Sequence, residues 1–265
     1  MLFKQAPGSK PPIDKGLAES WGLTRFQERG FLVTRTAILV DGGFYRKRAK
    51  HLWGVKDPKK DAEQLYAYCM AHINDKDRNE TRHLYRIFYY DCGPVGRRSV
   101  YHPLLKKNID LDKSDTYSWA NAFMEELKKK RKLALRLGTL ANQANYNLKP
   151  SVTKELLSGK KEIKDLAESD FDFNIQQKGV DMRIGIDISS LAYKKQVDQI
   201  ILIAGDSDFV PAAKLARREG IDFILDPMWA DIKEDLFEHI DGLKSQWSKH
   251  KNKSKKESPE LESNQ

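Results

Sequence analysis

The sequence predicts an α/β protein, with a three-layer α/β/α arrangement around a central, mostly parallel sheet. Two observations support this fold class. Short runs such as TAILV (36–40) and QIILIA (199–204) are almost wholly apolar, as in strands that are buried on both faces. Amphipathic segments of helical periodicity separate these runs along the chain, so helices are expected to cover both faces of the sheet.

The first half of the chain contains five predicted elements. They are a strand at 36–40, a helix near 61–74, a strand at 84–91, a helix near 115–130 and a strand at 133–140. The first strand is expected to end in a sharp turn at Asp41-Gly42-Gly43, because paired glycines favour tight turns. Asp61, with Gln64 three residues later, is the expected N-cap of the first helix.

The second half begins with a less regular stretch, 141–178. It is expected to hold a short strand or hairpin, a small helix at 151–158 closed by Gly159, and a strand near FNIQQ. Regular alternation then returns. The expected elements are a helix at 182–195, a strand at 199–204, a helix at 209–219 ended by Gly220, a strand at 221–225 and a helix at 231–242.

These elements define one predicted domain over residues 33–245. Residues 1–32 are rich in proline, glycine and charge and are interpreted as an N-terminal extension. Residues 246–265 are basic and low in apolar content, so a disordered tail is expected there.

Composition narrows the class of protein. The chain has 265 residues, and its two cysteines, Cys69 and Cys92, fit neither a disulfide framework nor a zinc site. No apolar stretch approaches the roughly 20 residues needed to cross a bilayer, and the N-terminus does not resemble a signal peptide. A cytoplasmic protein without a membrane partner is expected.

The net charge of +9 is concentrated in clusters, which are RKRAK (46–50), Arg97–Arg98, Lys106–Lys107, KKKRK (128–132) and KHKNKSKK (249–256). Any one run is as well explained by a solvated helix face. Together they favour a polyanionic partner, since Lys and Arg supply most non-specific affinity for nucleic acid. Arg46 to Arg48 and the 128–132 run are expected to add salt-sensitive affinity. The sequence leaves the oligomeric state open, a homo-oligomer included.

Aspartates fall where predicted strands and helices meet. Asp41 follows the first strand, Asp206 and Asp208 follow the strand at 199–204, and Asp181 begins the helix after QKGV. Ligands of a parallel α/β sheet bind beyond the carboxyl ends of its strands, so these carboxylates are expected to converge. Each one alone is also an ordinary cap or turn residue.

Converging carboxylates repel unless a cation lies between them. Mg²⁺ and Mn²⁺ prefer oxygen ligands, and a site of this kind suits phosphoryl chemistry. The chain has no P-loop, GxGxxG or HExxH motif. Asp91 reads as a turn residue. Asp187, six residues after Asp181 on the same helix, should face elsewhere and is interpreted as structural.

Four segments resemble the NYN domain, a branch of the PIN-like nuclease superfamily. They are VDGGFYRKRA (40–49), LGTL (137–140), QKGVDMRIGIDI (177–188) and IILIAGDSDFVPAAKLARREGIDFIL (200–225). The resemblance implies a PIN-like fold and a metal-dependent ribonuclease using Mg²⁺ or Mn²⁺, with Asp41, Asp181, Asp206 and Asp208 as its catalytic and metal-binding acids. Many members carry an asparagine shortly after the first acid, where this chain has Gly43-Phe44-Tyr45.

Neighbours of the acids are candidates for binding RNA. Lys178 is placed to pair with a phosphate, and Ser207 to donate a hydrogen bond to one. Tyr45 and Trp229 are candidates for stacking on a base, although a packed aromatic is the commoner role. Arg46 is a further candidate for binding the substrate.

Two other functions remain open. A haloacid-dehalogenase-like phosphatase also uses a parallel sheet and Mg²⁺, but it needs a second acid two residues after the nucleophile, where this chain has Gly43. A non-catalytic nucleic-acid-binding or regulatory module on the same fold is the other alternative, against which the presence of all four acids argues.

Overall fold

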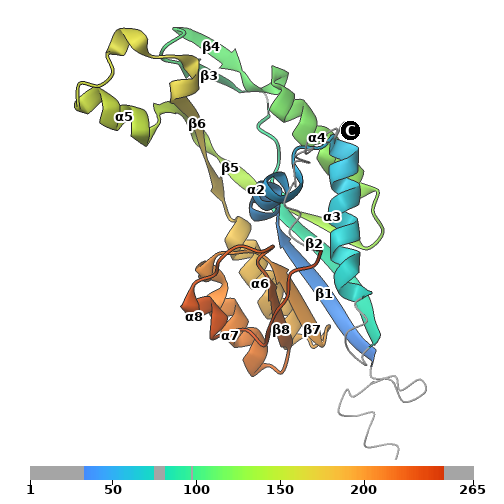
Figure 1. Ribbon diagram of the computed structural model, residues 1–265. Helices are drawn as coiled ribbons and strands as arrows, with labels where there is room; N and C mark the ends of the chain where they lie inside the picture. The colour runs from blue at the N-terminus through green and yellow to red at the C-terminus, as the bar shows by residue number, and fades with distance from the viewer. Residues whose placement is uncertain (1–32, 75–80, 97, 248–265) are drawn as a thin grey trace, which may run out of the picture.

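The structure is a computed structural model that describes residues 33–74, 81–96 and 98–247. A seven-stranded sheet has the order β6-β5-β2-β1-β7-β8-β9, and only β6 runs antiparallel to its neighbour (Figure 1). The strands are β1 Val33–Asp41, β2 Thr81–Cys92, β5 Leu133–Leu148, β6 Phe171–Lys178, β7 Gln199–Ile203, β8 Asp222–Asp226 and β9 Gly242–Leu243. The predicted fold class is therefore confirmed.

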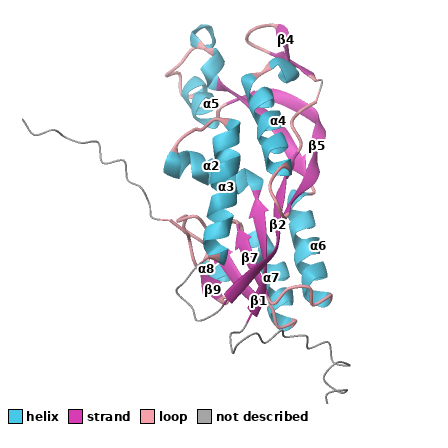
Figure 2. Cartoon of the chain, turned by 90° about the vertical axis from the view of Figure 1, so that its right-hand side faces the viewer, coloured by secondary structure: helices cyan, strands magenta, loops and turns pink. Residues whose placement is uncertain are grey.

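Helices cover both faces of this sheet (Figure 2). One face carries α2 Gly42–Trp53, α3 Pro58–Ile73 and α4 Asp115–Lys128, and the other carries α6 Val180–Tyr193 and α7 Val210–Arg218. The described chain also contains two short helices, α5 Pro150–Leu157 and α8 Glu234–Phe237, a separate hairpin of β3 Ser99–His102 and β4 Lys107–Asp110, and four single-turn 3-10 helices. No helix of the described part is long and apolar enough to span a membrane.

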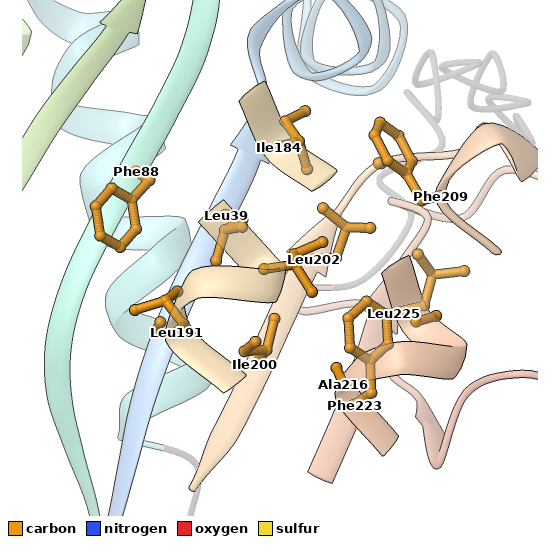
Figure 3. Packing of buried hydrophobic residues seen from close by; sticks show 14 of the residues in the cluster. Leu39, Phe88, Ile184, Leu191, Ile200, Leu202, Phe209, Ala216, Phe223 and Leu225 are labelled. Carbon is orange, nitrogen blue, oxygen red and sulfur yellow. The ribbon is translucent and has the colours of Figure 1, made fainter. Parts of the chain in front are cut away.

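The core divides into two clusters because strand side chains alternate between faces. In β1, Ala37 and Leu39 pack toward α6 and α7, whereas Ile38 and Val40 pack toward α2, α3 and α4. Figure 3 shows the first cluster, in which Leu39 lies beside Leu191 of α6 and Leu202 of β7, with Leu225 of β8 farther along the sheet. Each of the larger side chains, Ile38, Leu39 and Val40, contributes about 1.5–3 kcal/mol when it is fully buried.

Helix starts differ from the prediction in two places. The expected turn after β1 is instead the first turn of α2, which was not predicted, because Asp41 itself caps a helix that begins at Gly42. In α3 the N-cap is Asp57 rather than Asp61. The Asp57 carboxylate accepts the N–H of Lys60, and Pro58 occupies the first helical position, where its missing N–H costs little.

The predicted helix at 231–242 is wrong over most of its length. Only residues 234–237 are α-helical, and the chain then returns to the sheet as β9. Asp241 explains the change, because its carboxylate accepts the N–H of Phe223 in β8 and pairs with Arg217 of α7. These tertiary contacts hold the segment against the sheet edge.

The irregular stretch forms an extension beyond the sheet. β5 runs to Leu148 and pairs with β6 as a long antiparallel ribbon that carries α5 at its far end (Figure 1). The predicted helix at 151–158, closed by Gly159 with φ of +71°, and the strand near FNIQQ are confirmed. The predicted N-terminal extension lies outside the described residues, as does the predicted tail apart from residues 246 and 247.

Candidate functional site

The first acid is held by close packing at the end of β1. Asp41 is partly buried, and its Oδ1 accepts the backbone N–H of Phe44 at 3.1 Å. Gly42 has no room for a side chain, because a Cβ there would lie 2.6 Å from the Tyr89 ring and 2.7 Å from Asp91 Oδ2. The sequence Asp-Gly therefore lets α2 begin directly against β2.

Two further acids follow β7, the neighbour of β1. A Cβ at Gly205 would lie 2.4 Å from the Phe44 ring, so glycine allows this turn to pack against α2. Asp206 caps the short 3-10 helix Ser207–Phe209 by accepting the N–H of Asp208 at 3.3 Å, and both carboxylates are exposed. Pro211 lies in the first turn of α7, as predicted.

Asp181 follows β6, the second strand of the β5–β6 ribbon. β6 ends at Lys178, Gly179 adopts a left-handed conformation with φ of +77°, and α6 begins at Val180. Asp181 therefore lies in the first turn of a helix, where the unpaired N–H groups and the helix dipole favour anions. This is the junction that the QKGVD motif predicted.

Electrostatic coupling links the four acids. Burial raises the pKa of Asp41 above its ordinary value, the N–H of Phe44 opposes that shift, and the Asp181 carboxylate adds to it. Loss of hydration raises the pKa of Asp181 as well, and repulsion from Asp206 and Asp208 adds to the shift. The structure thus brings the predicted acids into one neighbourhood, in which the ionised forms disfavour one another.

The neighbourhood is not a closed metal site. Among the residues that the structure describes, no three His, Cys, Asp or Glu side chains lie close enough together to hold a metal ion. Asp41 and Asp206 instead direct oxygen atoms at backbone N–H groups as helix caps. The capping role that the sequence analysis weighed against a functional one is thus observed for Asp41 and Asp206, and the role of the four acids as a site stays a prediction.

Two lysines and a glutamine are neighbours of the acids in sequence or in space. Lys178 is exposed at the end of β6, and Lys233, which precedes α8, donates to Ser207 Oγ at 3.1 Å. Gln177 lies near the start of α2. A Cβ placed on Gly43 would lie 3.4 Å from Asp41 Oδ1 and 4.0 Å from Gln177 Oε1. Sequence reasoning missed Lys233, which no local pattern marks, and Gln177, although Gln177 stands within the QKGVD segment.

Two predicted substrate-binding residues are placed differently. Tyr45 is fully buried in the core beneath α2, so its ring cannot stack on a base, and that expectation is wrong. Arg46 forms an ion pair with the buried Asp91 and donates to the Tyr89 hydroxyl at 3.0 Å. Its guanidinium is therefore engaged in contacts within the protein at the end of β2, rather than free to bind a substrate.

The basic clusters are also more engaged than their sequences indicate. Arg48 donates twice to the Met228 carbonyl, so the RKRAK run leaves lysines rather than arginines exposed. In the 128–132 run, Lys128 and Lys129 pair with glutamates one helical turn earlier, and Lys132 donates to the Leu84 carbonyl. The expected contribution of these clusters to nucleic-acid affinity stays a prediction.

Other acids serve the fold. Asp187 accepts hydrogen bonds from Arg136 at 2.8 and 2.7 Å and from the Tyr90 hydroxyl at 2.8 Å, which agrees with its predicted structural role. Asp226, at the end of β8, is buried between Tyr68 and His72. Trp229, 41% exposed, donates its indole N–H to the Trp247 carbonyl.

Comparison with known proteins gives one family and one solved structure. The family model of the NYN domain matches residues 107–235, a span that contains Asp181, Asp206 and Asp208 but begins after β1 and Asp41. No curated protein matches. A crystal structure of a protein of unknown function, VPA0982 from Vibrio parahaemolyticus RIMD 2210633, aligns over 82% of this chain and 94% of its own, with 13% identity and a TM-score of 0.39.

That structural likeness is too distant to support a conclusion. The family match, in contrast, agrees with the motifs QKGVD and GDSDF and with a mostly parallel sheet flanked by helices. The chain therefore matches the NYN domain family over residues 107–235, in agreement with the resemblance that its motifs indicate.

Proposed function

We propose that this protein is a metal-dependent ribonuclease that hydrolyses RNA phosphodiester bonds at the site formed by Asp41, Asp181, Asp206 and Asp208. One observation carries the proposal. Carboxylates from three separate segments lie near one another at the carboxyl edge of the sheet; burial raises the pKa of Asp41 and Asp181, and repulsion between the carboxylates raises both further. Such repulsion lowers stability, and a bound cation relieves it.

The donor set suits Mg²⁺ or Mn²⁺. Its oxygen atoms are hard ligands, and histidine and cysteine, which favour zinc, take no part. Because no three of the described acidic side chains lie within coordinating reach of one another, the carboxylates would have to draw together when an ion binds. A bound ion of this kind lowers the pKa of water and polarises a phosphate oxygen.

The surrounding residues are suited to hold an RNA strand. The exposed Lys178 and the Lys233 ammonium, held 3.1 Å from Ser207 Oγ, supply positive charge beside the acids for a phosphate. The first turn of α6 adds backbone N–H groups. Gln177 offers a carboxamide near Asp41, where Gly43-Phe44-Tyr45 replaces the asparagine of many family members.

Asp208→Asn tests the proposal, since it keeps the side chain's shape and removes one charge. Mispositioning the metal and its water is expected to lower the rate of RNA cleavage about a hundredfold or more. The rate is measured on single-stranded and structured RNA and on DNA, with Mg²⁺ or Mn²⁺ and with a chelator. Excess Mn²⁺ is expected to restore part of the lost rate.

The matched control is Asp172→Asn, the same change at an exposed position of β6 six residues before Lys178. It should cleave like the wild type. Cleavage that persists in chelator, or a folded Asp208→Asn protein as fast as the wild type, would refute the site assignment.

A second candidate is a module of the same fold that binds RNA without cleaving it. Two observations favour it, namely the lack of a closed ligand set among the described residues and Gly43-Phe44-Tyr45 in place of the usual asparagine. Tight binding of RNA with no cleavage in either metal would support this candidate. For either function we propose a cytoplasmic setting, in which the buried Cys69 and Cys92 remain thiols.

A further inference from the structure

A cavity of about 410 Å³ lies between α4, the chain that follows β2, and the β5–β6 ribbon. Its size is within the range of pockets that bind small organic groups. Aromatic side chains form a large part of its lining, and they are Tyr117, Trp119, Phe123, Tyr146 and Phe173. Phe123 belongs to the core and Trp119 packs against it, whereas Tyr117 and Tyr146 are partly exposed and Phe173 is exposed, so the cavity presents ring surface that core packing does not cover.

The ribbon side of the cavity is built from rings held in place. Tyr146 and Phe173 are direct neighbours across β5 and β6, with ring centroids 5.3 Å apart. The buried His102 supports Tyr146 from behind at 4.5 Å. Phe173 remains 37% exposed, so its ring has surface available to a ligand.

The α4 side of the cavity is equally fixed. Trp119 and Phe123 stack one turn apart on α4, with centroids 5.0 Å apart and planes 14° from parallel. The Trp119 indole N–H donates to the Lys56 carbonyl at 3.0 Å, which anchors the ring to the chain before α3. Little conformational freedom is therefore lost when a flat group enters.

Polar side chains also line the cavity, and one of them lies near Asp41. Arg46, Asp91 and Gln177 line it. Gln177 also faces the space above Gly43, which Asp41 Oδ1 borders at 3.4 Å. The aromatic cavity and the acidic site therefore adjoin, with a carboxamide that can both donate and accept at their junction.

We infer that this cavity binds an unpaired nucleobase of single-stranded RNA, next to the phosphate at the acidic site. The inference deepens the proposed function and rests on it. Aromatic walls suit the faces of a base, and the Gln177 carboxamide suits its edge. A base in a duplex cannot enter without leaving its stack, so the cavity makes the protein selective for single strands.

The test measures RNA binding in chelator, where cleavage does not interfere. The probe is a single-stranded oligoribonucleotide with one 2-aminopurine, whose fluorescence falls when the base stacks on an aromatic ring. Phe173→Ala should weaken binding about fivefold to a hundredfold and abolish the quenching, because one stacking ring is lost. Phe173→Trp keeps a ring and should retain both.

The matched control is Tyr193→Ala. This ring is 58% exposed at the far end of α6, roughly 18 Å along the helix from Asp181. The control should bind the oligonucleotide and quench its fluorescence like the wild type. Duplex RNA should bind equally well to the wild type and to the Phe173 variants.

The outcomes separate this inference from the proposed function. If Phe173→Ala binds the oligonucleotide as tightly as the wild type, the inference about the cavity is wrong, even if the protein cleaves RNA. Quenching that depends on Phe173 supports the cavity, even if no RNA is cleaved and the ribonuclease proposal fails. Equal losses in Phe173→Ala and Phe173→Trp would also overturn it, since stacking would then not be the cause.

Discussion

Two groups of aspartates lie at the same edge of the sheet and differ in almost every physical respect. The paired acids, Asp91 and Asp226, end β2 and β8 and are buried among hydrogen-bond donors. The open acids are Asp41 after β1, Asp206 and Asp208 after β7, and Asp181 at the start of α6, and the carboxylates of Asp41 and Asp181 are subject to repulsion from others of the group. The end of a strand thus predicts the position of an aspartate, whereas the hydrogen-bond donors and charges around the carboxylate determine its role.

Burial explains the difference. A carboxylate removed from water is strongly destabilising unless charges and hydrogen bonds replace its hydration. Asp91 has Arg46, the Tyr89 hydroxyl and the Cys92 N–H, and Asp226 has Tyr68, His72 and the Met228 N–H. Both therefore stabilise the fold, whereas in the function we propose the open acids are available to bind a cation.

The largest effect is expected from removing the cation of a paired acid. Arg46→Ala leaves Asp91 buried without its counter-charge and should lower the free energy of unfolding by about 3–5 kcal/mol. Urea unfolding measures the change. Lys47→Ala, at the exposed neighbouring position of α2, should stay within about 0.5 kcal/mol of the wild type. Equal stability of the two variants would show that Asp91 does not need Arg46.

A smaller loss is expected from removing one neutral donor. Tyr68→Phe deletes the hydroxyl that lies 2.6 Å from Asp226 Oδ2 and should lower the free energy of unfolding by about 1.5–3 kcal/mol. Tyr66→Phe, on the partly exposed surface of the same helix, is the control. A Tyr68→Phe protein as stable as this control would place Asp226 among the open acids instead.

The open acids should show an effect of opposite sign. Asp181→Asn removes repulsion from Asp206 and Asp208 and should raise the free energy of unfolding at neutral pH by about 0.5–1 kcal/mol, allowing for solvent screening. Thermal unfolding should shift upward by roughly 1–4 °C for a chain of this size. Asp172→Asn, at an exposed position of β6, serves again as the control.

The pH dependence of this gain follows from the sign of the shift. The pKa of Asp181 is raised, so the wild type loses stability as the pH increases from 3.8, the ordinary value, through the folded-state pKa. The advantage of Asp181→Asn should therefore be present at neutral pH and vanish below about pH 3.8. A variant that is less stable at neutral pH would contradict the repulsion.

The candidate site could be predicted from sequence to the extent that it depends on local order. Apolar runs of parallel strands end where they turn, and Asp41, Asp206 and Asp208 follow such runs directly. Asp181 was equally readable because a glycine and an acid at the start of a periodic segment mark a helix N-terminus. The helix that begins at Gly42 was missed, since two glycines normally favour a turn.

The sequence by itself determined the alternation of strands and helices, the carboxyl edge as the place of the acids, and the structural role of Asp187. These follow from periodicity and chain direction, which are local properties. Only the tertiary structure decided that Tyr45 is buried, that Arg46 pairs with Asp91, and that Gln177 lies beside Asp41. Those outcomes depend on which segments meet across the sheet, and pairing and burial between distant segments leave no periodic signal in the chain.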